Sequence, residues 1–359
     1  MRTFSAGKLA ITYVGVFLGA GFVSGQELWQ FFACFGPAGF AGFLLSAAAF
    51  FAVNYLLLDL VRSTGQQQLG RLMTCGEHPR ARWLVDGLQY LFLFGIVVIM
   101  VAGAASLIRQ FLPLPLPLAG ALFALLVLLA SLRGLGSLVA AFSLLVPVTT
   151  ALAVAVGIAV FARGGFAPAP AAGAVSPLLP TWWAGGVAYA AYNLFGTVGI
   201  LLPFAPLLAD TGTLRRGLGG GTALLSLLAG SILAALAARP DAGAADLPMA
   251  VLAEELHPAL GGAYGLLMGL GMFAAALGSL MALVNQMALR FPALEKRRPA
   301  LLSVLTAGAF LLSLMGFAGL IGVVYPFFGY VSIPFFVCLV VNWLRQRRSL
   351  PSAGNGPAA

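Results

Sequence analysis

The chain has 359 residues, of which 61% are hydrophobic and 8% are charged, and its formal net charge is +9. Soluble domains carry about 25% charged residues, which cover their surface with polar groups. This composition therefore excludes a soluble protein and predicts one large membrane domain, with the lipid bilayer as its surrounding partner.

Ten apolar segments follow one another along the chain, and most are close to the length that a helix needs to cross a bilayer. They predict an all-α membrane protein with about ten transmembrane helices. The segments are 9–35, 38–60, 84–111, 117–132, 137–162, 183–208, 218–238, 261–288, 299–317 and 318–344.

The connecting segments differ from the spans in composition. Residues 248–258 are amphipathic and short, which predicts a surface helix between the seventh and eighth spans. Residues 164–181 are rich in Pro, Ala and Gly and predict an external loop. The small and polar residues 349–359 predict a disordered tail, so that a single transmembrane domain would cover residues 1–348.

Basic residues are distributed unevenly between the two sides that ten spans create. Arg109, Arg163 and Arg239 fall on one side, and the other 16 of the 19 Lys and Arg residues fall on the side of both termini. Because cytoplasmic loops hold an excess of Lys and Arg, we expect both termini on the cytoplasmic side of a bacterial inner membrane. The same rule explains the positive net charge, so we expect no nucleic-acid partner.

The first apolar segment contains four glycines, at positions 15, 19, 21 and 25, and polar side chains within residues 24–27. Each glycine weakens a helix by about 1 kcal/mol relative to alanine. Non-helical backbone at membrane depth is tolerated only where protein or a water cavity covers it. Close helix packing through small residues is the alternative explanation, but it does not account for the polar residues. We therefore predict an interruption near Gly19–Phe22.

The sixth apolar segment has a similar composition at its centre, where Asn193, Gly196 and Thr197 precede Pro203. Spans one and six are the first members of two halves of five spans each. Glycine-interrupted segments at corresponding positions of two halves indicate the substrate site of inverted-repeat transporters. We therefore predict a second interruption, near residues 193–197.

Two stretches match the pattern of a known family. One is Gly19-Ala-Gly-Phe-Val-Ser-Gly-Gln-Glu27 with Phe31-Phe32 and Phe35-Gly36 after it, and the other is Tyr192-Asn193-Leu194. With the ten-span layout, they resemble the YkvI-like membrane proteins, relatives of the amino acid–polyamine–organocation superfamily. The resemblance implies a LeuT-type fold, a 5+5 inverted repeat with discontinuous helices 1 and 6, whose repeats would cover about 9–162 and 183–344. It also implies secondary active transport of a solute that binds near the breaks.

A broken helix presents free N–H groups at one end and free carbonyl groups at the other, so it can hold an anion and a cation close together. A zwitterion needs both, which favours an amino acid or a related amine as the small-molecule substrate. The candidate contacts are Gly19, Ala20, Gly21, Ser24, Asn193, Gly196 and Thr197 for its polar groups and Phe22, Tyr192 and Phe195 for its apolar part. Ordinary helix packing is the alternative role of the three aromatic side chains.

Glu27 is the only acidic residue well inside a predicted span, where a carboxylate is costly and indicates function by default. It lies six residues beyond Gly21, or about 9 Å outward of the predicted break at 1.5 Å rise per residue. Arg109, near the outer end of the third span, lies at a matching depth. Three roles stay open: an ion pair with Arg109 that acts as a gate, a proton carrier, and a direct contact with the substrate.

The resemblance also implies a sodium site between spans one and eight. Its ligands would be the carbonyl groups of Gly15 and Leu18 and the hydroxyl of Ser279. Ala275 and Gly278 supply no side-chain oxygen, although sodium-coupled relatives often have a second hydroxyl in this region. Coupling to Na⁺ and coupling to H⁺ both stay open, and Na⁺ is the only cofactor candidate.

Other functional classes find little support. The three cysteines lie far apart, and neither they nor His78 and His257 show a metal-binding spacing. Because there is no Ser/His/Asp set and no phosphate-binding loop, we expect no catalytic residues, no metal site and no enzyme activity. A channel, a facilitator or a non-transporting sensor on the same scaffold is the alternative to a secondary transporter.

Overall fold

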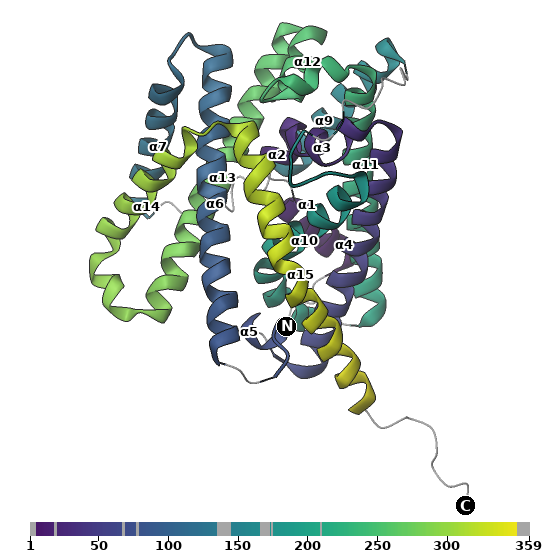
Figure 1. The fold of residues 1–359 in the computed structure, drawn as a ribbon, viewed down its shortest axis with the longest axis vertical. Coiled ribbons are helices and arrows are strands. Elements are labelled where there is room, and N and C mark those ends of the chain that lie inside the picture. Colours follow the sequence, from purple (N-terminus) through teal and green to yellow (C-terminus); the bar gives the residue numbers. More distant parts are fainter. Residues whose placement is uncertain are drawn as a thin grey trace, which may run out of the picture.

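The computed structural model describes residues 5–17, 20–66, 69–76, 79–134, 145–165, 173, 175–208 and 210–349. Within these ranges the regular elements are helices, and most of the long ones run along one common direction (Figure 1). Six of the described helices are long and apolar enough to cross a membrane. The chain is therefore a multi-pass α-helical membrane protein, as its composition predicts.

The first five predicted segments correspond to the elements of the first half. In chain order these are α1 (Ala6–Phe17), α2 (Ala20–Ser24), α3 (Gln26–Phe31), η1 (Ala33–Phe35), α4 (Pro37–Thr64), α5 (Leu69–Leu72), α6 (Pro79–Phe111), α7 (Leu116–Leu132) and α9 (Leu145–Gly164). The first segment thus forms several short helices, whereas the second to fifth each contribute one long helix.

The last five segments correspond to the second half, and the predicted surface helix is present as α12. In chain order the elements are α10 (Trp182–Leu201), η3 (Leu202–Leu207), α11 (Thr211–Ala238), η4 (Pro240–Ala244), α12 (Pro248–Leu256), α13 (Pro258–Arg290), η5 (Pro292–Arg297), α14 (Arg298–Ser313) and α15 (Phe317–Ser349). Ser349 ends α15, and the rest of the predicted tail, 350–359, lies outside the described residues.

Capping residues determine several helix boundaries. The side chain of Thr181 accepts a hydrogen bond from the N–H of Ala184 at the start of α10. The side chain of Asp210 accepts one from the N–H of Thr213 at the start of α11. Such side-chain oxygens satisfy the free N–H groups of a first helical turn. The Asp210 cap explains why α11 begins before residue 218, the predicted start of the seventh span.

The two halves pack against each other reciprocally. Helix α1 of the first span packs on α11 of the seventh, whereas α10 of the sixth span packs on α4 of the second. Helices α6 and α13, from the third and eighth spans, pack on each other, and α7 and α14 lie together at one side of the bundle (Figure 1). Each contact has a counterpart in which the halves are exchanged, as a 5+5 inverted repeat requires.

Small residues allow α4 and α10 to approach closely. A Cβ atom on Gly186 would lie 2.7 Å from the carbonyl oxygen of Gly42. The hydroxyl of Ser46 donates to the Gly186 carbonyl at 2.8 Å. Glycine and serine at such contacts let helix backbones touch in a membrane and supply hydrogen bonds between helices. The sixth span is thereby held in the centre of the bundle.

The first span is interrupted, and the break among the described residues lies at Gly25. This residue has φ of 82°, a left-handed conformation that glycine adopts without strain. Residues Ala20–Ser24 before it are helical. Within the described residues, the break therefore lies later in the chain than the predicted one at Gly19–Phe22. Leu18 and Gly19 lie outside the described residues. The chain therefore changes direction beyond Phe22, and α3 starts a new helix.

The sixth span is also discontinuous, but not where its glycine and polar residues predict. Helix α10 runs through residues 193–197 without a break, and the regular helix gives way to the 3₁₀ segment η3 at Leu202. The amide nitrogen of Asn193 donates to the Tyr189 carbonyl, and the hydroxyl of Thr197 donates to the Leu194 carbonyl, so both polar groups are satisfied by their own helix. Proline instead ends the helix, because Pro203 and Pro206 lack the N–H groups that would continue it.

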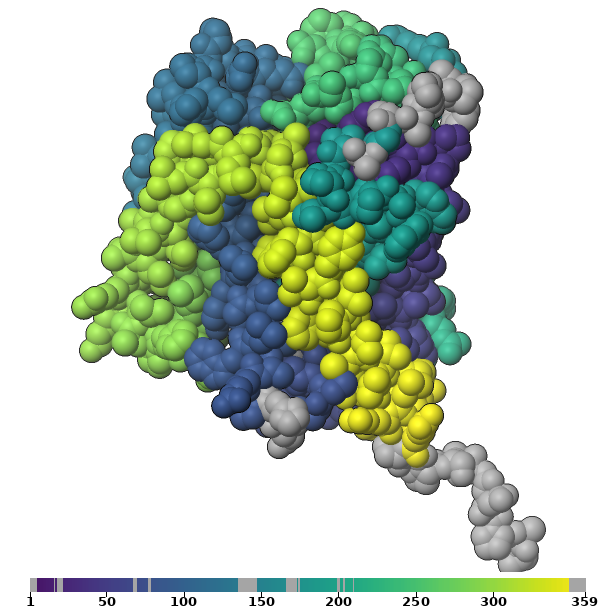
Figure 2. All heavy atoms as spheres, in the orientation of Figure 1, coloured from purple at the N-terminus to yellow at the C-terminus, as the bar shows by residue number. Residues whose placement is uncertain are grey.

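The described end of the predicted external loop packs onto the last helix. Residues 175–180 form no helix, as predicted, while 166–172 and 174 lie outside the described residues. The hydroxyl of Ser176 donates to the Gly322 carbonyl at 2.6 Å, and the hydroxyl of Tyr330 donates to the Leu178 carbonyl at 2.6 Å. Figure 2 shows atoms in the teal of this part of the chain beside the yellow α15. This segment therefore covers part of α15.

Two exposed alanines provide a matched test of the predicted topology. Ala244 in η4 and Ala293 in η5 both lie on the surface in 3₁₀ turns. In a cysteine-free background, we expect Ala244→Cys to react with an impermeant maleimide on intact cells and Ala293→Cys to react only after permeabilisation. The reverse pattern, or labelling of both residues from one side, would contradict cytoplasmic termini with ten spans.

Candidate functional site

The buried side chain of Glu27 lies opposite the middle of the sixth span. It is in the first turn of α3, directly after the turn at Gly25, and only 3% of it is exposed. The hydroxyl of Tyr192 on α10 donates a hydrogen bond of 2.6 Å to Glu27 Oε2. A carboxylate at this position is held by a phenol from another span, which is the environment of a functional group rather than of a lipid-facing side chain.

Aromatic rings surround this hydrogen bond. The ring of Tyr192 stacks on that of Tyr325 from α15, with centroids 4.4 Å apart and planes 4° apart. Tyr189 meets Tyr192 edge-on at 5.4 Å, and Phe31 of α3 lies 5.6 Å from it. All four rings are buried. Spans one, six and ten therefore meet in one aromatic cluster around a carboxylate.

Two glutamines of α3 add acceptor groups next to Glu27. Gln26 and Gln30 lie one helical turn apart, and both side chains are buried. The amide nitrogen of Gln30 donates to the Ala318 carbonyl at 2.9 Å, which leaves its oxygen as the free end of the amide. Among the described residues, neither Gln26 Oε1 nor Gln30 Oε1 has a hydrogen-bond donor. Helix α3 thus carries three buried acceptor side chains, of which Gln30 Oε1 lies beside Gly322 of α15.

The eighth span holds the break of the first span in place. The hydroxyl of Tyr264 on α13 donates to the Val23 carbonyl at 2.6 Å. The Ser24 hydroxyl accepts a hydrogen bond from the N–H of Gln26 at 3.2 Å. Backbone groups near a helix break in a membrane need such partners, because no bulk water reaches them. Both bonds stabilise the change of direction that places Glu27 against Tyr192.

The structure does not bring Glu27 and Arg109 together. Arg109 is exposed on α6, whereas Glu27 is buried against Tyr192. The ion pair with Arg109, one of the three roles left open for Glu27, is therefore wrong. The outward position of Glu27 beyond the break stays consistent with the structure, because Gly25 lies beside Met249 of the surface helix α12. The turn at Gly25 places α3 along α10, with Glu27 on Tyr192 and Phe31 close to Gly185.

The other predicted substrate contacts are divided between two places. Phe22 is fully buried in α2, on the same side of the break as Val23 and Ser24. Phe195 packs edge-on against Phe92 of α6, with centroids 5.7 Å apart. A Cβ atom on Gly196 would lie 2.8 Å from the Phe92 ring, so this glycine serves packing with α6. For Ala20 and Gly21, the structure describes only the helical backbone.

Two curated proteins are similar to the chain, although no family model matches it. YkvI of Bacillus subtilis (strain 168), an uncharacterized membrane protein, is 28% identical over 349 residues, which are 96% of this chain and 98% of YkvI. The chain is a homologue of YkvI. YyaD of the same strain, an uncharacterized protein, is 27% identical over 107 residues, which are 29% of this chain and 30% of YyaD.

Solved structures confirm the fold that the resemblance implies. The inward-facing conformation of Mhp1 matches with a TM-score of 0.72 and 14% identity, over 96% of this chain and 78% of Mhp1. MhsT in complex with L-phenylalanine matches with a TM-score of 0.59 and 15% identity, over 96% of this chain and 89% of MhsT. The chain therefore has the LeuT-type fold of these proteins.

The predicted sodium ligands are only partly described. Gly15 is half-buried on α1, Ser279 is half-buried on α13, and Leu18 lies outside the described residues. Helix α13 contacts the first span at α2. Sodium binding between spans one and eight stays a prediction. Within the described ranges, no group of three or more His, Cys, Asp and Glu side chains could hold a metal ion.

Sequence reasoning missed Tyr189, Tyr325 and Gln30 as members of the site. Tyr189 lies three residues before Tyr192, so helical spacing places both on one side of the sixth span. Gln30 lies three residues after Glu27, and the same spacing could have found it. Tyr325 precedes Pro326 in the tenth span, and no local pattern relates it to residues 27 or 192. Only the packing of α15 on α10 brings it in.

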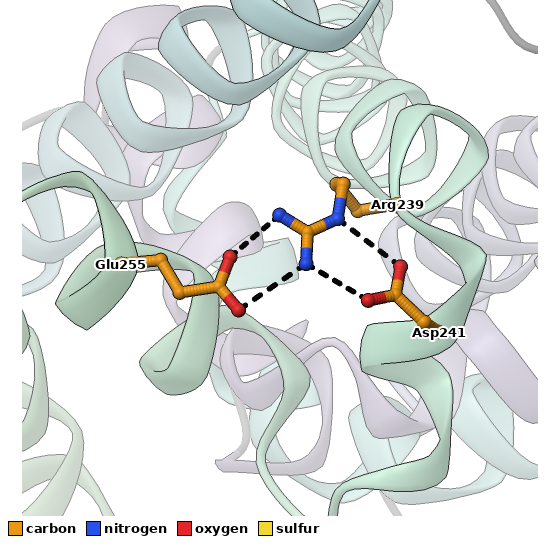
Figure 3. A network of polar contacts seen from close by, with 3 residues as sticks. All are labelled: Arg239, Asp241 and Glu255. Carbon is orange, nitrogen blue, oxygen red and sulfur yellow. Dashed lines mark hydrogen bonds and ion pairs between the residues drawn. The ribbon is translucent and has the colours of Figure 1, made fainter.

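A second polar network lies outside the spans, where α11 ends. Figure 3 shows Arg239 between two carboxylates, one on either side. Its guanidinium contacts Asp241 of η4 at 2.8 Å and Glu255 of α12 at 2.7 Å. The hydrogen bonds from Arg239 hold the pKa of the Asp241 carboxyl below its usual range. The network ties η4 and α12 to the end of α11.

We expect Arg239→Gln to lower the stability only slightly, and only above acidic pH. Exposed ion pairs contribute up to about 1 kcal/mol to the free energy of unfolding. Because the folded-state pKa of Asp241 is depressed, this stability is fully present above the unfolded-state pKa of about 4 and is lost as pH falls through the lower, folded-state pKa. Thermal unfolding of both proteins between pH 2 and 8 should show a difference at pH 7 that shrinks as the pH falls below about 4. A difference that stays constant down to pH 2 would contradict the electrostatic explanation.

Proposed function

We propose that the chain is a secondary active transporter of a small organic solute, an amino acid or a related amine, coupled to a gradient of Na⁺ or H⁺. The observation that carries this proposal is the buried Glu27 carboxylate, hydrogen-bonded to Tyr192 beside the break of the first span. Ionisable groups inside membrane domains mark the pathways of substrates and protons. Broken helices in corresponding positions of two halves mark the binding site of inverted-repeat transporters.

The fold supports the same function by analogy. One protein with a similar fold, MhsT, was solved in complex with L-phenylalanine. Spans one, six and ten meet at Glu27 in a cluster of aromatic rings, and the proposal places the solute beside this cluster. In this proposal, the repeats extend over about 9–162 and 183–344, and the protein lies in a bacterial cytoplasmic membrane with both termini inside.

The coupling ion would bind at one of two places. Sodium would bind between Gly15, Leu18 and Ser279, where the resemblance to the YkvI-like proteins implies a site. A proton would be carried by Glu27, the acidic side chain that the structure buries against α10. Ser279→Ala should raise the sodium concentration needed for half-maximal uptake in the first case, and Glu27→Gln should remove the pH dependence of uptake in the second.

Uptake into proteoliposomes tests the proposal. We expect saturable uptake of radiolabelled amino acids or amines that is driven by a transmembrane gradient of Na⁺ or H⁺, imposed in either direction, and accelerated by unlabelled solute on the opposite side. Flux that neither saturates nor shows this acceleration would favour a channel. Saturable uptake that ignores both gradients would favour a facilitator, and an absence of flux for every solute would favour a sensor.

A further inference from the structure

We propose that Glu27 binds the protonated amino group of the solute and binds a proton when the solute is absent, so that an organic cation and H⁺ compete for one carboxylate. This inference rests on the proposed function and specifies it. The solute would be an amine without a carboxylate, and transport would exchange one amine for one proton.

The Glu27 carboxylate lacks a permanent positive partner. None of the ion pairs found in the described part of the chain includes it. Helices α2, α3 and α10 contain no Lys, Arg or His. A buried carboxylate without a cation is costly, so it takes up a proton or holds a cation. The hydrogen bond from Tyr192 supports the charged form but does not neutralise it.

The groups beside Glu27 are acceptors, which suits an ammonium group. Within the described residues, the side-chain oxygens of Gln26 and Gln30 are buried and have no donor. An ammonium group carries three donors and no acceptor, so it suits the Glu27 carboxylate in a helix whose other polar side chains expose acceptors; Gln30 Oε1 lies beside Gly322 of α15. A solute carboxylate would find no cationic side chain on these helices.

The aromatic cluster suits the same ligand. The rings of Tyr192 and Tyr325 are stacked, Tyr189 and Phe31 lie beside them, and the hydroxyl of Tyr192 joins this cluster to the carboxylate. A desolvated cation is attracted to the electron-rich face of an aromatic ring. The rings also offer apolar surface to the carbon skeleton of an amine. An anion would gain neither the charge attraction nor the cation–π contact.

Glu27 is the group in this cluster that can exchange a proton. The titratable side chains that face it are Tyr189 and Tyr192 from α10 and Tyr325 from α15. All three are phenols, which keep their protons at physiological pH. The exchange is balanced: the protonated carboxyl group releases H⁺ to solvent, and the resulting carboxylate pairs with the R–NH₃⁺ group that enters.

Ligand binding to the purified full-length protein tests the inference without any transport. The probes are primary amine hydrochlorides (methylamine, butylamine and 2-phenylethylamine), with 2-phenylethanol as a neutral and 3-phenylpropionate as an anionic counterpart. Thermal shift reports binding, and a pH-indicator dye in weakly buffered solution reports released protons. We expect 2-phenylethylamine to raise the melting temperature and to release about one proton per bound molecule. Its affinity should rise about tenfold for each unit of increasing pH, over the range in which Glu27 is protonated in the unliganded protein.

The variants separate Glu27 from other carboxylates. We expect Glu27→Gln to abolish proton release and to weaken amine binding at least tenfold, while Glu295→Gln on the surface changes neither. Equal binding of 2-phenylethanol, proton release that survives Glu27→Gln, or a panel in which no amine binds or releases a proton would overturn the inference. If Glu27→Gln fails to fold, Tyr192→Phe answers the same question: loss of its hydrogen bond to Glu27 should move proton release to higher pH, and an unchanged pH range would overturn the inference.

Failure of the inference can be distinguished from failure of the proposed function. Proton-releasing amine binding without flux in proteoliposomes would overturn transport and leave the site as inferred. Coupled uptake of an amino acid or a neutral solute, without proton release on amine binding, would keep the transporter and overturn the amine site.

Discussion

Gly25→Ala is expected to destabilise the protein and to abolish transport, although it adds only one methyl group. Gly25 has φ of 82°, and any other L-residue there costs roughly 1–2 kcal/mol. Its Cβ atom would also lie 2.9 Å from Met249 Cγ on α12. Relief of this strain would turn α3, and Glu27 would lose its hydrogen bond to Tyr192. Thermal unfolding and proteoliposome uptake measure the two effects.

Gly230→Ala is the matched control for this substitution. Gly230 lies inside α11, and no atom would lie within 4 Å of an added Cβ, apart from the helix's own backbone. Alanine at such a helical position stabilises by about 0.5–1 kcal/mol relative to glycine. Opposite signs of the two stability changes would show that the backbone conformation of the glycine determines the effect of adding a methyl group. A Gly25→Ala variant as stable and as active as the wild type would mean that the left-handed turn is not needed.

Tyr192→Ala is expected to reduce transport about 100-fold, and Tyr192→Phe about 10-fold. The phenylalanine variant keeps the stack on Tyr325 and removes only the hydrogen bond to Glu27 Oε2. Hydrogen bonds to charged groups contribute about 1.5–3 kcal/mol, and each 1.4 kcal/mol corresponds to tenfold. The alanine variant also removes the ring. Initial uptake rates in proteoliposomes, normalised to the amount of inserted protein, provide the comparison.

Tyr55 provides the control for this pair. It lies on α4 and stacks on Phe51, with centroids 6.3 Å apart. We expect Tyr55→Phe to transport as the wild type does. If Tyr192→Phe transports as fast as the wild type, the hydrogen bond to Glu27 is not needed for transport. If Tyr192→Ala also transports as fast as the wild type, the Tyr192 ring is not needed either.

Much of the fold could be predicted because hydrophobicity in a membrane protein is a strong local signal. Helix α7 extends over Leu116–Leu132, one residue longer than its predicted segment, because continuous apolar sequence must be helical in lipid. Glycines were less reliable guides to helix breaks. Gly25 breaks a helix, whereas Gly196 lies within one and makes room for Phe92. Glycine serves both purposes, and only three-dimensional contacts distinguish them.

The candidate site was predictable in part for the same reason. Glu27 and Tyr192 could be selected because a carboxylate inside a span and a polar stretch in the sixth segment are unusual in local sequence. Their contact could not be predicted, since it depends on the direction that α3 takes after Gly25. Tyr325 is about 300 residues distant from Glu27 in sequence, and it joins the site only through the packing of α15 on α10.

Solute counterflow in proteoliposomes with Glu27→Gln and Glu295→Gln tests most directly whether the Glu27 cluster is the site of transport. Both substitutions remove one carboxylate charge at nearly constant size, but Glu27 is buried against Tyr192, whereas Glu295 is exposed beside Arg298. We predict that Glu295→Gln exchanges solute at the wild-type rate and that Glu27→Gln, inserted to the same level, does not exchange it. Wild-type counterflow by Glu27→Gln would contradict the account.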